Sequence, residues 1–124
     1  MYELKIKTDF ASAHNLRGYQ GACESLHGHN WHVEVLVRSS KLNDIGLVID
    51  FKVLKAHTNE IMEELDHKYL NDLDAFKEVN PSSENIAEYI YKELENKLSA
   101  EDAKVSRVTV YESKNSSASY FKEG

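Results

Sequence analysis

The sequence predicts an α+β domain in which two helices cover one face of an antiparallel sheet. Three observations lead to this fold class. Apolar and polar residues alternate near both ends of the chain, as they do in strands, and two segments in the middle carry apolar residues at helical spacing. No repeat or Gly/Ser-rich linker divides the 124 residues. We therefore expect residues 1–124 to form one domain with the element order β-β-α-α-β-β.

The first predicted strand covers residues 2–14, and the second begins near His27 and continues through residues 29–38. In the first strand one face is formed by alternate residues, namely Tyr2, Leu4, Ile6, Phe10 and Ser12. In the second strand the alternation is cleaner, and the apolar face consists of Trp31, Val33, Val35 and Val37. Residues 15–26 connect the two strands, which is long for a hairpin, and loops of such length in small domains are often functional.

Two helices are expected in the middle of the chain. The first follows Asp50, a plausible N-cap, and its apolar stripe is Phe51, Leu54, Thr58, Ile61 and Leu65. The second begins near residues 81–84, where a serine can cap it, and its stripe is Ile86, Ile90, Leu94 and Leu98, with Ala87 and Tyr91 beside it. Two strands then end the chain, one around Val108 and Val110 and a short one at residues 117–122.

Composition excludes several classes of protein. The formal net charge is −6 and there is no basic block, so we expect no nucleic-acid partner. No apolar run approaches the ~20 residues that span a bilayer, and the first ten residues alternate instead of forming a signal peptide. The single cysteine excludes an internal disulfide and suits a reducing compartment. These features predict a soluble, cytoplasmic protein.

The histidines indicate a metal site. His27 and His29 flank a glycine, and in an extended chain their imidazoles point to the same face. His14 ends the first predicted strand, so an antiparallel hairpin places it beside them. Three imidazoles with a vacant position are typical of catalytic Zn²⁺, although a turn with solvated histidines is the alternative. We expect His32 and His57 to stay outside this set.

Four further residues carry chemistry with more than one interpretation. Cys23 is a fourth zinc ligand, a buried apolar residue or a reactive thiol beside a metal. Asp66 and His67 follow the first helix and form either a general acid–base pair or an ordinary charged helix end. Glu112 continues the inward face of the strand that contains Val108 and Val110, so it is either a buried carboxylate that needs N–H donors or a strand end in solvent.

Taken together, these segments resemble the 6-pyruvoyltetrahydropterin synthase / 6-carboxytetrahydropterin synthase family. The similar segments run in family order along nearly the whole chain: residues 10–16, 23–31, 47–51, 65–71, 80–87 and 108–113. The resemblance implies the tunnelling fold, with subunits that form a barrel and assemble into a homohexamer of two trimers with sites at subunit interfaces. It implies 7,8-dihydroneopterin triphosphate as the substrate.

The resemblance also implies a role for each site residue. His14, His27 and His29 match the zinc ligands, and Cys23 matches the catalytic thiol, with Asp66 and His67 as its acid–base partners. Glu112 matches the carboxylate that anchors the pterin ring, and Glu84 falls in a segment that lines the pterin pocket. A triphosphate also needs cations, for which Arg17, Lys114 and residues of a neighbouring subunit are candidates.

Three activities occur in the family, and the compact chain is most like the branch that makes 6-carboxy-5,6,7,8-tetrahydropterin on the route to queuosine. A second branch makes 6-pyruvoyltetrahydropterin. A third cleaves the side chain as an aldolase and uses a glutamate at the position of Glu24, so a dual activity is a further hypothesis. A non-catalytic protein with a closed zinc site of Cys23 and three histidines is the alternative outside the enzymes.

Overall fold

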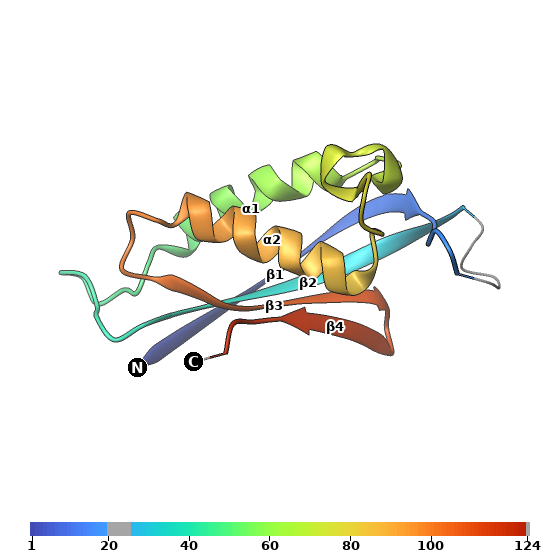
Figure 1. Ribbon diagram of the computed structural model, residues 1–124. Coiled ribbons are helices and arrows are strands. Elements are labelled where there is room, and N and C mark those ends of the chain that lie inside the picture. The colour runs from blue at the N-terminus through green and yellow to red at the C-terminus, as the bar shows by residue number, and fades with distance from the viewer. Residues whose placement is uncertain (20–25, 124) are drawn as a thin grey trace.

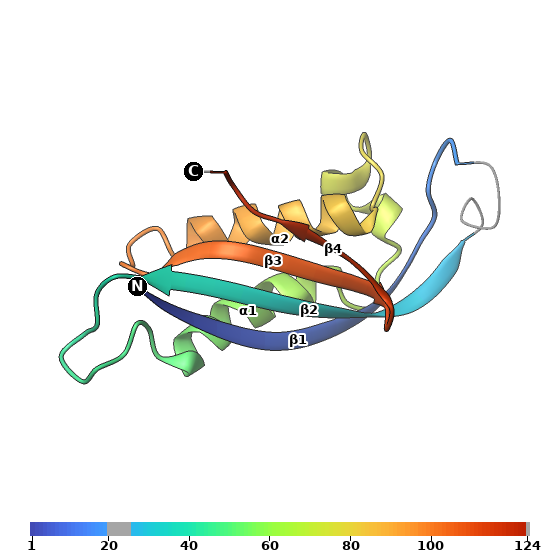
Figure 2. The ribbon, with the colours of Figure 1, turned by 90° about the horizontal axis from the view of Figure 1, so that it is seen from below.

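The structure is a computed structural model that describes residues 1–19 and 26–123, with four strands and two long helices in the predicted order (Figure 1). The elements are β1 (Tyr2–His14), β2 (His27–Ser39), α1 (Phe51–Leu65), the short 3-10 helices η2 (Leu70–Asp72) and η3 (Asp74–Phe76), α2 (Ser83–Lys97), β3 (Lys104–Ser113) and β4 (Ser116–Tyr120). The strands form one antiparallel sheet in the order β1-β2-β3-β4, and both helices lie on the same face (Figures 1 and 2). The predicted α+β class is confirmed.

β1 and β2 form a long hairpin that brings distant parts of the sequence together. Their pairing runs without a break from Tyr2 opposite Ser39 to His14 opposite His27. β2 begins at His27, as expected from the hairpin, and its pairing with β1 continues to the last residue of that strand. The end of β1 and the start of β2 therefore lie side by side, as the hairpin argument requires.

The helices begin at the predicted caps. The Asp50 side chain accepts a hydrogen bond from the Lys52 N–H, and the Ser82 hydroxyl accepts one from the Asn85 N–H. The predicted stripes are buried, with one correction: Phe51 is 47% exposed, so the buried stripe of α1 begins at Leu54. Periodicity gives the direction of a side chain, but it does not show where the layer beneath that side chain ends.

The core fills the space between the sheet and the helices. The inward residues of β2 are completely buried, and so are the stripes of α1 and α2, among them Leu54, Ile61, Ile86, Ile90 and Leu94. Trp31 lies at one end of this core, where its ring stacks on Phe10 and its indole N–H donates to the Ser12 carbonyl. No helix in the described part of the chain is long and apolar enough to cross a membrane.

Candidate metal centre and acid–base pair

Three imidazoles and one carboxylate converge at the end of the sheet beside Trp31. His14 is the last residue of β1, and His27 and His29 lie in the first three residues of β2. Glu112 lies near the end of β3. One donor atom of each residue lies within 4.8 Å of the corresponding atoms of the others. The structure therefore brings together the three histidines that the hairpin argument selected, and it adds Glu112 to them.

The nitrogen atoms that face one another are the Nε2 atoms. Nε2 of His14 lies 3.0 Å from Nε2 of His27, and Oε1 of Glu112 lies 3.4 Å, 3.6 Å and 3.0 Å from Nε2 of His14, His27 and His29. His14 is 1% exposed, and its Nδ1 lies 2.7 Å from the Pro81 carbonyl oxygen. Since a carbonyl can only accept, Nδ1 carries the proton, and the Nε2 lone pair of His14 points into the cluster.

The surroundings of His29 favour its neutral form. Trp31 packs edge-on against His14 and His29, with ring centroids 4.9 Å and 5.3 Å apart. Burial lowers the pKa of His29 below its ordinary value, although the Glu112 carboxylate opposes this shift. Nε2 of His29 is buried beside Oε1 of Glu112, which lies 3.0 Å away. A neutral, desolvated nitrogen atom of this kind is suited to bind a metal ion.

Asp66 and His67 form a pair in the turn that directly follows α1. His67 Nδ1 lies 2.7 Å from the Asp66 carboxylate, and Asp66 accepts a hydrogen bond of 2.8 Å from the Ala11 N–H. This backbone donor is the main reason that the pKa of Asp66 lies below its ordinary value. The His67 backbone has φ of +54°, and its side chain is 83% exposed. The imidazole is therefore oriented by its carboxylate partner and open to a ligand.

The turn is held against β1 by hydrogen bonds on both sides. The His67 N–H donates to the Ala11 carbonyl over 2.6 Å, and the Ala13 N–H donates to the Lys68 carbonyl over 3.0 Å. The buried Ser12 hydroxyl donates to the Leu65 carbonyl and accepts from the Lys68 N–H. These contacts bracket Asp66 and His67, and they occupy the outer edge of β1 around residues 11–13.

The pocket beside the acid–base pair does not include the metal cluster. Asp66 and His67 line an open pocket of about 340 Å³ together with Asp9, Phe10, Ala11, Asn30 and His32. None of the three clustered histidines lines this pocket, and neither does Glu112. The cluster of described residues that could hold a metal ion includes neither His32 nor His57, as expected. His57 lies on α1 with its Nδ1 3.4 Å from Glu60.

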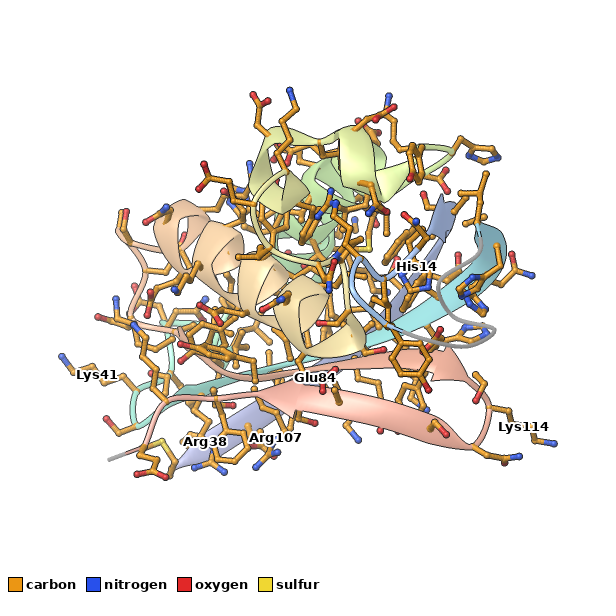
Figure 3. The ribbon with its side chains drawn as sticks, turned by 45° about the vertical axis from the view of Figure 1, so that its right-hand side comes forward. His14, Arg38, Lys41, Glu84, Arg107 and Lys114 are labelled. Atoms are coloured by element: carbon orange, nitrogen blue, oxygen red, sulfur yellow. The ribbon has the colours of Figure 1, made fainter. Side chains whose placement is uncertain are left out.

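The remaining candidates are more dispersed. Glu84 is exposed on the first turn of α2, whereas His14 is buried at the end of β1 (Figure 3). Lys114 extends away from the molecule at the β3–β4 turn, and the Arg17 guanidinium donates to the backbone carbonyls of Asn71, Phe76 and Val79 (Figure 3). Cys23 and Glu24 lie outside the described residues.

Comparison with known proteins identifies the family. Residues 3–123 match the family model described as 6-pyruvoyl tetrahydropterin synthase. The chain belongs to this family. It is 39% identical to the 6-carboxy-5,6,7,8-tetrahydropterin synthase of Synechocystis, with 98% of this chain and 94% of the relative covered, and 32% identical to the enzyme of that name from Bacillus subtilis, with 89% and 77% covered.

Solved structures of synthases agree with the fold. The 6-pyruvoyl tetrahydropterin synthase of Caenorhabditis elegans superposes with a TM-score of 0.86 at 25% identity, and 98% of this chain and 96% of that chain are covered. The tunnelling fold expected from the resemblance is confirmed for this chain. The cluster of three histidines and Glu112 is consistent with a metal site typical of 6-pyruvoyl tetrahydropterin synthases.

Sequence reasoning did not find several contacts of this site. It placed Glu112 on the inward face but did not place its carboxylate beside the imidazoles. The alternation through Val108 and Val110 was the available signal, since it continues in phase to Glu112. The Pro81 carbonyl and the Ser12 hydroxyl carry no comparable signal, because their partners lie more than 50 residues away in the sequence.

Proposed function

We propose that the protein is a zinc-dependent 6-carboxy-5,6,7,8-tetrahydropterin synthase. It converts 7,8-dihydroneopterin triphosphate to 6-carboxytetrahydropterin, acetaldehyde and triphosphate, on the route to queuosine. The observation that carries this proposal is the convergence of three imidazole Nε2 atoms in a member of this family. The 39% identity to a relative that bears the name of this activity favours it over the sister activities.

His14, His27 and His29 are the residues that would hold the zinc ion. Their donor set fits, because neutral imidazoles are good zinc ligands and because His14 is fixed in the required tautomer by Pro81. When bound, zinc supplies a Lewis acid that polarises oxygen atoms of the substrate side chain.

Protons of the substrate side chain are moved by His67 and Cys23 in this proposal. The Asp66 carboxylate holds His67 Nδ1, which directs the exposed Nε2 toward a ligand. Together with His67, Cys23 moves protons at the carbon atoms next to the polarised carbonyl. Asp66 stays ionised and orients the imidazole, as its lowered pKa favours.

The pterin ring is assigned to Glu112 and Glu84. A carboxylate that accepts two N–H bonds from the ring fixes the orientation of the ring. The side chain of the substrate then reaches the metal and the acid–base pair in one geometry. Glu112 is 35% exposed beside the imidazoles, which leaves its carboxylate accessible to a ring that enters the site.

We further propose that the site is completed by neighbouring chains in a homohexamer. The pocket of Asp66 and His67 does not include the metal cluster of the same chain. The outer edge of β1 is occupied around residues 11–13, but residues 2–10 lie on a sheet edge, and β4 forms the other edge. Pairing of these edges between copies supports a barrel of three chains, and two such trimers form the hexamer. With one cysteine, the enzyme suits a reducing compartment, which we propose is the cytoplasm.

Product analysis tests this function. Zinc-loaded protein is incubated with 7,8-dihydroneopterin triphosphate, and the products are identified by mass spectrometry. We expect 6-carboxytetrahydropterin with acetaldehyde. A 6-pyruvoyl or hydroxymethyl product contradicts the proposed specificity and assigns a sister activity. The variants Cys23→Ala and Glu24→Ala then show which of the two residues that reaction requires.

The absence of turnover contradicts the enzyme assignment, and alkylation of Cys23 then tests the structural zinc protein. In an enzyme the thiol reacts while zinc stays bound, and activity is lost. In a closed site of Cys23 and three histidines, the thiol reacts only after the metal has been removed.

A further inference from the structure

The position of Glu112 suggests a role beyond anchoring the pterin ring. We propose that Glu112 is the fourth ligand of the metal ion in the free protein, and that it leaves the metal when a pterin ring takes its carboxylate. This inference rests on the proposed function and deepens it. It makes ring binding the event that opens a coordination position.

The distances support a four-ligand centre. Zinc binds nitrogen and carboxylate oxygen at ~2.0–2.2 Å in tetrahedral sites, and the edge of such a tetrahedron is ~1.6 times this length, or ~3.3–3.6 Å. Oε1 of Glu112 lies 3.0–3.6 Å from the three Nε2 atoms. His14 and His27 are separated by 3.0 Å at the same atoms. One oxygen atom that is nearly equidistant from three nitrogen atoms has the arrangement of a fourth ligand.

The backbone directs Glu112 to this place. Tyr111 pairs with Ser117 and Ser113 pairs with Ser116, so Glu112 is the extra residue of a bulge between β3 and β4. Its pairing with β2 has also ended, because the last partners in that ladder are Tyr111 and His32. A bulge re-aims a side chain and frees it from the regular ladder. Glu112 can therefore reach the imidazoles although its neighbours Val108 and Val110 are buried in the core.

The two roles of the carboxylate compete. With Glu112 bound, all four tetrahedral positions are filled and the centre is closed, whereas a catalytic zinc site needs an open position. A pterin ring offers the carboxylate a pair of N–H donors. When Glu112 accepts them, a position beside the three imidazoles becomes free for oxygen atoms of the substrate side chain.

The test uses a ligand that cannot reach the metal by itself. The full chain is loaded with Co²⁺, whose visible absorption reports changes in its ligands, and is titrated with pterin, the ring without a side chain. Ring binding is followed separately by fluorescence. Glu112→Gln is compared with the wild type, and Glu78→Gln is the matched control because it removes an exposed carboxylate from a loop. Zinc affinity of all three proteins is measured by competition with a chelator.

We expect pterin to change the Co²⁺ spectrum of the wild type and of Glu78→Gln, but not that of Glu112→Gln. We also expect Glu112→Gln to bind zinc at least ~10-fold more weakly, since even groups behind the ligands affect metal affinity by about this factor. Pterin binding to the wild type without a spectral change overturns the inference and leaves the proposed function intact. If pterin does not bind, the proposed function fails, and equal zinc affinity in wild type and Glu112→Gln then overturns the inference as well.

Discussion

Ser12 is the residue whose replacement most directly probes how the acid–base pair is held. Its buried hydroxyl donates to the Leu65 carbonyl, one of the last carbonyls of α1, which have no partner within the helix, and accepts from the Lys68 N–H. Ser12→Ala removes both hydrogen bonds, each with a net worth of ~1 kcal/mol, so we expect the free energy of unfolding to fall by ~2 kcal/mol. The turn that carries Asp66 and His67 then loses two of the contacts that hold it and keeps its backbone hydrogen bonds to Ala11 and Ala13.

We expect Ser12→Ala to lower kcat at least ~10-fold, because a small misplacement of a catalytic group is costly. Zinc affinity should not change, since the hydrogen bonds of the hydroxyl go to Leu65 and Lys68 and not to the imidazoles. The matched control is Thr58→Val, which also deletes a buried hydroxyl bonded to a helix carbonyl, that of Leu54. That carbonyl also accepts a helical N–H, so the control should lose well under ~1 kcal/mol.

The assays are urea unfolding at equal chain concentration, steady-state kinetics and chelator competition. Two results would refute the reasoning: a Ser12→Ala protein as active as Thr58→Val, or one that loses activity only because it no longer binds zinc.

Three other predictions follow from single groups in the structure. The pKa of Asp66 lies below its ordinary value of 3.8, so metal-free wild type should be more stable than Asp66→Asn at pH 6. This difference in stability should disappear as the pH falls through the lowered pKa. Urea unfolding at several pH values measures the difference, and a difference that persists in strong acid contradicts the prediction. Zinc at 100 times its dissociation constant should stabilise the wild type by ~2.7 kcal/mol, and a chelator should reverse this; His29→Ala should show no such gain at the same zinc concentration. In Arg17→Ala the free energy of unfolding by urea should fall by ~2 kcal/mol, because three backbone carbonyls lose a donor. Lys114→Ala should unfold like the wild type. Equal stability of the two variants would be evidence against this role for Arg17.

The parts of the fold that depend on local patterns were predictable from the sequence. Alternation gave the buried face of β2, and the caps Asp50 and Ser82 follow from side chains that compete for free N–H groups at a helix start. Phe51 was assigned to the buried stripe but is half exposed, since burial depends on what lies opposite a residue.

The site was predictable where strand register decides it. His14, His27 and His29 come together because an antiparallel hairpin has only a few registers, and parity places all three side chains on one face. The contacts of Ser12 and Pro81 depend on how the connection after α1 folds back over β1, which no local pattern encodes. For Glu112, alternation with Val108 and Val110 predicts the inward face, but it does not predict the bulge that brings the carboxylate to the imidazoles.

The most direct test of the account is the ligand set of the metal in the protein as purified and loaded with zinc. X-ray absorption at the zinc edge distinguishes sulfur at ~2.3 Å from nitrogen and oxygen at ~2.0–2.2 Å. The account predicts only nitrogen and oxygen ligands, with the imidazole pattern lost in a His27→Ala variant. A sulfur ligand at ~2.3 Å would contradict it, because Cys23 would then close the site as a structural ligand and could not serve as the free thiol of an enzyme.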